Sequence, residues 1–166
     1  MFTVRRIRAD EGQTLRSIRL AALADAPGDA TTTLARAEAR SDDHWHEAAA
    51  ANASGGLQAT FFAEAAGDGG EPVGLIGAYA NESGIVNLVG LWSAPGHRDI
   101  GVASALIDAV AGWARTIGAD RLRMWVVERN EFAKAFYVQE GFEPTGATIP
   151  YELDPRLSQV AMVRSV

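Results

Sequence analysis

The sequence predicts a single α+β domain built on a mixed sheet. Three β-rich runs follow one another between residues 57 and 93, and helical and strand patterns alternate only after them. Strands joined by short turns pair antiparallel, whereas a strand–helix–strand unit joins parallel neighbours. No internal repeat or low-complexity linker divides the 166 residues. We therefore expect one domain over residues 1–166, with a meander followed by crossover helices.

The composition excludes several classes of function. A hydrophobic fraction of 48% and a charged fraction of 22% are typical of a soluble globular protein. The absence of cysteine rules out disulfides, thiolate metal sites and a cysteine nucleophile. The net charge of -6 argues against a general nucleic-acid binder. No apolar run is long enough for a membrane span or a signal peptide, so we expect a cytoplasmic protein without membrane or nucleic-acid partners.

The first half begins with an alternating strand over Phe2 to Arg8. A helix then runs from near Gly12 to about Asp25, with Asp10 as its cap and residues 26–29 as its end. One face of that helix carries Leu15, Ile18, Arg19 and Ala22.

Residues 31–40 are ambiguous between helix and loop. A second helix spans His44 to Ala53, with its cap within residues 41–43. His44 and His46 flank Trp45, and because side chains two apart on a helix point to different sides, we expect them on a partly exposed helix face rather than in a metal pair.

The meander consists of strands Leu57–Ala65, Pro72–Ala80 and Ile85–Ser93. A glycine-dense connector at residues 66–71 and a turn at residues 81–84 separate them, as in β-hairpins.

A strong amphipathic helix follows from Val102 and stops at Gly118, with one face formed by Val102, Leu106, Ala109, Val110, Trp113 and Ile117. We then expect a strand over Arg121–Val127 and a helix from Asn130 to Gly141. An extended piece at Phe142–Thr145 and a short final strand at Val160–Val163 complete the chain.

The loop before the amphipathic helix has the chemistry of an anion cradle. A helix N-terminus offers unpaired backbone N–H groups and a partial positive charge. Gly101 and Ala103 leave those groups accessible, and Arg98 adds a cation with several donors. A plain strand-to-helix connection with a glycine for tight packing explains the spacing equally well.

The segment resembles the acyl-CoA-binding signature of the GNAT superfamily of N-acyltransferases, through Arg98, Gly101 and Ala103. Asp99 and Ile100 depart from it, because many members have a glycine and a basic residue there. A second segment is similar to the family's later motif through Asn130, Ala133, Phe136, Tyr137, Gly141 and Phe142. The resemblance implies a mostly antiparallel central sheet that splays between the fourth and fifth strands, with flanking helices.

The resemblance also implies the site. The cofactor-binding residues would be Leu91, Trp92, Ser93, Arg98, Asp99, Ile100, Gly101, Val102, Ala103, Ser104, Asn130, Ala133, Phe136 and Tyr137. Backbone groups of the strand around Leu91 to Ser93 would pair with the pantetheine arm, Asn130 would hold it, and Tyr137 would act as general acid.

The general base is not assigned by the resemblance. Asn87, which cannot act as a base, stands where the family often has a carboxylate. Glu128 and Glu82 are the candidates, and removal of the proton by water chains from a partly deprotonated acceptor is the alternative. The expected activity is direct transfer of an acetyl group from acetyl-CoA to an amine, without a metal, by a monomer or homodimer. Residues 25–53 would form the wall of the site on the acceptor side. The sequence does not identify the acceptor. The alternative is a non-catalytic acyl-CoA sensor on the same fold.

Overall fold

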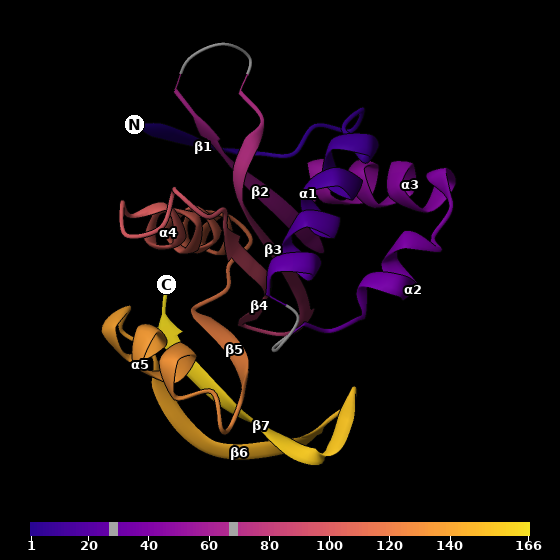
Figure 1. Ribbon diagram of the computed structural model, residues 1–166. Coiled ribbons are helices and arrows are strands. Elements are labelled where there is room, and N and C mark those ends of the chain that lie inside the picture. The colour runs from indigo at the N-terminus through magenta and orange to yellow at the C-terminus, as the bar shows by residue number, and fades with distance from the viewer. Residues whose placement is uncertain (27–29, 67–69) are drawn as a thin grey trace.

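The computed structural model describes residues 1–26, 30–66 and 70–166. Its strands form one seven-stranded sheet in the order β1-β2-β3-β4-β5-β7-β6 (Figure 1). The elements are β1 (Phe2–Arg6), α1 (Gly12–Asp25), α2 (Leu34–Glu38), α3 (Asp42–Ala53), β2 (Gln58–Ala65), β3 (Pro72–Glu82), β4 (Ile85–Ser93), α4 (Val102–Thr116), β5 (Arg121–Val127), α5 (Glu131–Gln139), β6 (Glu143–Tyr151) and β7 (Asp154–Ser165). The predicted α+β class and mixed sheet are confirmed.

The two faces of the sheet carry different helices. Figure 1 shows α1, α2 and α3 on one side and α4 on the other. Side-chain alternation along β2 explains this arrangement, because Phe61 belongs to the core cluster under α4 and Phe62 to the cluster under α1 and α3. On β3, Ile76 and Leu75 divide in the same way. The predicted apolar face of α4 packs on the sheet, with Val102, Leu106 and Val110 fully buried.

The meander forms as the sequence predicts. Strands β1 to β4 pair antiparallel in chain order, and β2 and β3 are in register from Gln58 opposite Tyr79. Residues 67–69 of the predicted glycine-rich connector, and residues 27–29 of the predicted end of the first helix, lie outside the described residues.

The cap expected for the first helix is wrong. Glu11, rather than Asp10, occupies the N-cap of α1 and makes no side-chain capping bond. Its carboxylate accepts instead from Arg5 of β1, at 2.7 Å for both oxygens. Two charge-assisted bonds from Arg5 hold the Glu11 carboxylate, so it does not cap the helix. The second predicted cap is confirmed, since the Ser41 hydroxyl accepts from the His44 amide at 3.1 Å.

The C-terminal strands are longer than the sequence indicated. The extended piece at Phe142–Thr145 is the start of β6, and the short strand at Val160–Val163 is the centre of β7. Strand β6 is exposed from residue 143 to residue 150, so no alternation of apolar residues marks it. Backbone pairing with β7, which an apolar pattern does not report, decides its length.

In the part of the chain that the structure describes, one of the two crossover helices joins adjacent parallel strands. Helix α4 connects β4 to β5, which pair parallel. Helix α5 connects β5 to β6, but β7 lies between them and pairs antiparallel with both. The expectation that both crossovers join neighbours is therefore wrong for α5.

Candidate active site

The central feature of the sheet is a gap between β4 and β5. The two strands pair only from Ile85 opposite Arg121 to Leu88 opposite Met124. Beyond that point β4 stays paired with β3 as far as Ser93, while β5 stays paired with β7 as far as Val127. Both strands therefore leave backbone polar groups facing the gap, and such groups bind a ligand's amides readily. The expected splay is confirmed.

A bulge in β4 opens the gap. Leu75 and Gly77 of β3 are two residues apart, yet their partners Trp92 and Val89 are three apart, so β4 has one extra residue. Gly90 lies in that stretch with φ +64, a conformation that favours glycine. The bulge bends β4 and redirects the backbone at Leu91.

The predicted cradle closes the same end of β4. Gly101 is the N-cap of α4, with φ +88, and no atom lies within 4 Å of the place a Cβ would occupy. The amides of the first turn of α4 are thus approached from open space. Asp99, also with positive φ, and Ile100 are exposed beside it, whereas the Val102 side chain is buried. Ala103 is half-buried.

Arg98 is held beside the cradle by two partners. Its Nε donates to the Ser93 carbonyl at 3.1 Å, and its Nη2 donates to the carboxylate of Asp25 at the end of α1. The indole Nε1 of Trp92 donates to the same carboxylate at 2.9 Å. Hydrogen bonds from Trp92 and then Arg98 lower the pKa of Asp25. The end of α1 is thereby fastened to the end of β4 and to the loop before α4.

The second motif forms α5, beside the gap. The side-chain oxygen of Asn130 caps the helix by accepting from the Ala133 amide at 3.1 Å. Tyr137 is 5% exposed and packs edge-on against Phe136 and Phe142, with ring centroids 5.2 and 5.5 Å away. The motif thus sets the start of the helix and the position of its phenol.

Ser104, also expected at the cofactor, links the two crossover helices. Its hydroxyl donates to the carboxylate of Glu140, which caps the C-terminus of α5. This contact ties the first turn of α4 to the last turn of α5. The Ser104 backbone amide remains part of the first turn of α4.

The two candidate bases, Glu128 and Glu82, lie at opposite ends of the gap, and Asn87 lies near the closed end. Glu128 is exposed just beyond β5, at the open end of the gap. Glu82 pairs with Arg123 at 2.6 Å near the closed end. Asn87 is 1% exposed, and its side-chain oxygen accepts from Arg123 Nε at 2.8 Å. Asn87 is thus part of a buried polar network that joins β4 to β5.

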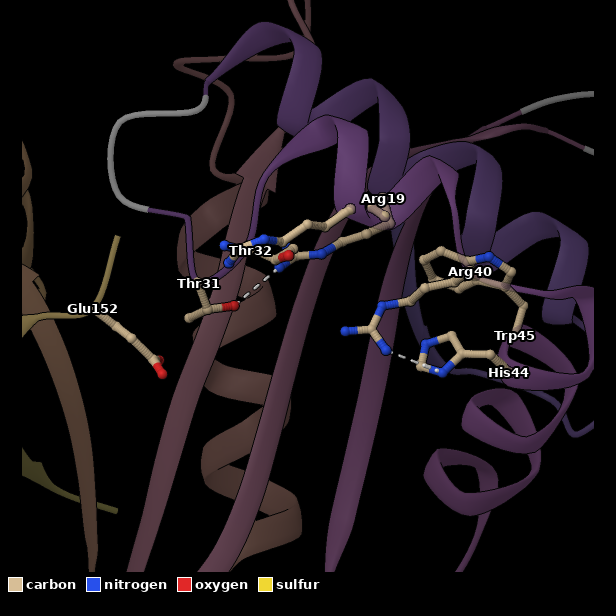
Figure 2. A pocket seen from close by; sticks show the side chains of 9 residues that line it. Arg19, Thr31, Thr32, Arg40, His44, Trp45 and Glu152 are labelled. Atoms are coloured by element: carbon tan, nitrogen blue, oxygen red, sulfur yellow. Dashed lines mark hydrogen bonds between the residues drawn. The ribbon is translucent and has the colours of Figure 1, made fainter. Parts of the chain in front are cut away.

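A separate pocket lies on the face of the sheet that α1, α2 and α3 cover. It is a pocket of about 400 Å³, whose lining includes Arg19, Arg36, Arg40, His44, Trp45 and Glu152. Figure 2 shows Thr31 and Glu152 at one end and His44 and Trp45 at the other. Arg19 Nη2 lies 3.5 Å from the Thr31 hydroxyl, and Arg40 Nη1 lies 3.3 Å from His44 Nδ1. The pocket lies largely within the stretch expected to form the acceptor wall.

The residues that line this pocket were not predicted from the sequence to lie together. One signal was available, because Arg19 shares the helix face of the buried Leu15, Ile18 and Ala22. A charged residue on an apolar face indicates a polar site beneath it. His44, expected on a partly exposed helix face, is half-buried and lines the pocket.

Two further properties concern the described part of the chain. Within residues 1–26, 30–66 and 70–166, no group of three or more His, Asp or Glu residues is placed to hold a metal ion. Among the helices of those same ranges, none is long and apolar enough to cross a membrane.

Comparison with known folds gives several full-length likenesses. An acetyltransferase of the GNAT family from Streptococcus pneumoniae is 19% identical with a TM-score of 0.74, and each chain covers 100% of the other. A GCN5-related N-acetyltransferase from Kribbella flavida is 20% identical with a TM-score of 0.74, over 99% of this chain and 98% of that one. The protein yncA from Salmonella typhimurium, whose structure includes its cofactor acetyl-CoA, is 16% identical with a TM-score of 0.72, over 99% and 94%.

At these identities the solved structures show the fold alone. The family model shows the family. Comparison with curated proteins finds no match. The model of the acetyltransferase (GNAT) family matches residues 22–142, which span the gap, the cradle and α5. The chain therefore belongs to the GNAT acetyltransferase family.

Proposed function

We propose that this protein is an N-acetyltransferase that moves an acetyl group from acetyl-CoA to the amine of an acceptor, in a ternary complex. One observation carries the proposal: β4 and β5 separate after Leu88 and Met124, and the cradle at Gly101 lies where β4 leads into α4. A strand with unpaired backbone groups and a helix N-terminus suit the two chemical parts of coenzyme A, its pantetheine amides and its pyrophosphate.

The residues present fit that cofactor. Open space at the Gly101 Cβ position lets a phosphate reach the amides of Gly101, Val102, Ala103 and Ser104. Arg98 lies beside that turn and supplies the positive charge, once its guanidinium moves from Asp25 to the phosphate. Backbone groups of Leu91 to Ser93 bind the pantetheine arm from one side, and the Asn130 amide holds it from the other.

Acetyl-CoA supplies an activated acetyl thioester when it is bound. The amine nitrogen forms a bond to the acetyl carbon, the carbon–sulfur bond breaks, and the amine loses a proton. Tyr137 donates its phenolic proton to the departing sulfur. Glu128, exposed at the open end of the gap, is our candidate acceptor for the amine proton, directly or through water. The transfer is direct because the chain has no cysteine to form a thioester of its own.

A thiol-release assay tests this proposal. The protein is incubated with acetyl-CoA and a panel of amines, and free coenzyme A is followed with a thiol reagent. We expect release that depends on the amine, together with calorimetric binding of acetyl-CoA. Failure to bind acetyl-CoA or coenzyme A would contradict the cradle assignment.

One observation favours a second candidate, a non-catalytic acyl-CoA sensor. The family often has a carboxylate where this chain has Asn87, and Asn87 is buried in a network with Arg123. The sensor predicts tight binding of acetyl-CoA without release of coenzyme A to any amine in the panel. The same assay therefore separates the two candidates.

A further inference from the structure

We propose that the pocket between α1, α2, α3 and the β6–β7 turn binds a carboxylate of the acceptor, so that the substrate is a small amino acid rather than a simple cationic amine. The inference rests on the proposed function, because it names the substrate class of the same site. It concerns the three arginines of the pocket, Arg19, Arg36 and Arg40.

The pocket is locally positive. Although the whole chain carries a net charge of -6, the pocket lining carries three arginines against one glutamate, Glu152. None of these three arginines makes a salt bridge within residues 1–26, 30–66 and 70–166. Arg5 and Arg98, by contrast, each pair with a carboxylate, that of Glu11 and that of Asp25 respectively. The positive field of the pocket is therefore left for a ligand.

Arg19 is a partly desolvated cation. Its side chain is half-buried, and burial lowers the pKa of its guanidinium because the charged form loses water. Arginine nevertheless stays cationic at neutral pH. Its side-chain contact is the Thr31 hydroxyl, 3.5 Å from Nη2. Such a desolvated guanidinium is stabilised most by an anion with planar oxygens, which it binds through two hydrogen bonds.

The neighbouring donors match the same ligand. Because arginine only donates, the contact with Arg40 makes His44 Nδ1 an acceptor and leaves the proton on Nε2. Burial and then Arg40 lower the pKa of His44, so the ring is neutral at pH 7. Trp45 lines the pocket, is 5% exposed, and its Nε1 has no hydrogen-bond partner in the described part of the chain. These residues supply more donors than acceptors, as an oxygen-rich anion requires.

Arg19 also lies against β4 beside the proposed cofactor segment. Arg19 Nη1 lies 2.5 Å from the place a Cβ on Gly90 would occupy, so its guanidinium rests on bare backbone at the bulge of β4. The next residue, Leu91, begins the segment that binds the pantetheine arm. Because Gly90 and Leu91 are adjacent, one small molecule with an amine a few bonds from its carboxylate can reach both the gap and Arg19.

Matched pairs of acceptors test the proposal. Each pair contains an α-amino acid and the same amine without its carboxylate, such as leucine with isoamylamine and phenylalanine with phenethylamine. With acetyl-CoA we expect kcat/KM to be about ten-fold or more higher for the amino acid, the effect of one charge-assisted contact. Equal or faster turnover of the decarboxylated amines overturns the proposal.

Variants identify the residue responsible. Arg19→Gln should raise KM for amino acids about ten-fold or more and leave the decarboxylated amines unchanged. Arg16→Gln, on the same helix but outside the pocket, is the matched control and should keep the preference. An equal loss for both members of a pair in Arg19→Gln overturns the assignment. Should that variant misfold, the exposed Arg36→Gln replaces it with the same expectation.

A binding measurement keeps the inference separate from the proposed function. If acetyl-CoA binds but no amine is acetylated, the proposed activity fails. The pocket is then judged by thermal shift with N-acetyl amino acids and with their carboxyl amides. Stabilisation by the acids alone, lost in Arg19→Gln, supports the carboxylate site, and equal stabilisation or none overturns it.

Discussion

Gly101 matters both for its backbone conformation and for the open space beside it. Its φ of +88 lies in the left-handed region, and its missing Cβ would project into open space at the first turn of α4. Gly118, at the other end of α4, has φ +81 and equally open surroundings. The two glycines therefore share backbone strain on substitution and differ only in their place relative to the cradle.

This pair yields the first prediction. Gly101→Val and Gly118→Val should each destabilise the protein by about 1–3 kcal/mol, because valine is strained at positive φ. Only Gly101→Val should also weaken coenzyme A binding, by about ten-fold or more, because its methyl groups cover the helix amides. Isothermal titration calorimetry and urea unfolding measure the two effects. Equal affinities in both variants would place the pyrophosphate elsewhere.

Tyr137 carries the second prediction. Tyr137→Phe should lower kcat about 100-fold or more while leaving the acetyl-CoA dissociation constant unchanged, because only proton donation to the sulfur is lost. Tyr79→Phe on β3 is the control and should have the wild-type rate. Tyr79 lies opposite Asn87, near the closed end of the gap. A wild-type kcat in Tyr137→Phe would remove Tyr137 from the reaction.

Helix α5 makes its N-cap residue serve both the fold and the site. The Asn130 oxygen caps the helix, and its amide nitrogen is the group we assign to the cofactor. The substitution Asn130→Asp keeps a capping oxygen and adds a charge that favours a helix N-terminus, but it removes the amide donor. Asn130→Ala removes both.

The third prediction follows from that difference. Asn130→Asp should unfold at a urea concentration close to wild type and bind acetyl-CoA more weakly. Asn130→Ala should bind as weakly and also lose about 0.5–2 kcal/mol of stability. Urea unfolding with calorimetry resolves the two. Wild-type affinity in Asn130→Asp would restrict Asn130 to a capping role.

At the scale of the whole molecule, charge pairs fasten elements that are distant in sequence. Arg5 of β1 contacts Glu11 before α1 at 2.7 Å and Glu64 of β2 at 2.6 Å. The hydrogen bonds from Arg5 lower the pKa of Glu11 below its ordinary value of 4.5. Because the folded-state pKa is the lower one, this pair stabilises the fold above about pH 4.5, and the stabilisation is lost as the pH falls through the folded-state pKa.

The fourth prediction concerns that acid dependence. The free energy of unfolding should fall between pH 5 and pH 3 in the wild type, and Glu11→Gln should remove part of that slope. Glu38→Gln, at an exposed position on α2, is the control. Urea unfolding at a series of pH values measures the slope. An unchanged slope in Glu11→Gln would mean that other carboxylates cause the acid loss.

Much of the fold, and the local backbone geometry of the candidate site, were predictable because their signals are local. The 3.6-residue spacing from Val102 to Ile117 defines α4, and the cap at Asn130 defines α5. The exposed strand β6 has no such signal, because its partner β7 is chosen by backbone pairing alone. The cap of α1 was predicted wrongly for the same reason, because no local pattern reports the contact between the Glu11 carboxylate and Arg5.

The sequence by itself determined the element order, the cradle at Gly101 and the helix that carries Tyr137, since each depends on residues within a few positions of one another. Only the tertiary structure decided the bulge of β4 against β3, the fastening of Arg98 by Asp25, and the pocket of Arg19. These depend on contacts between residues far apart in the chain, such as the 73 positions between Asp25 and Arg98. No local pattern encodes such distances; packing of the helices on the sheet sets them.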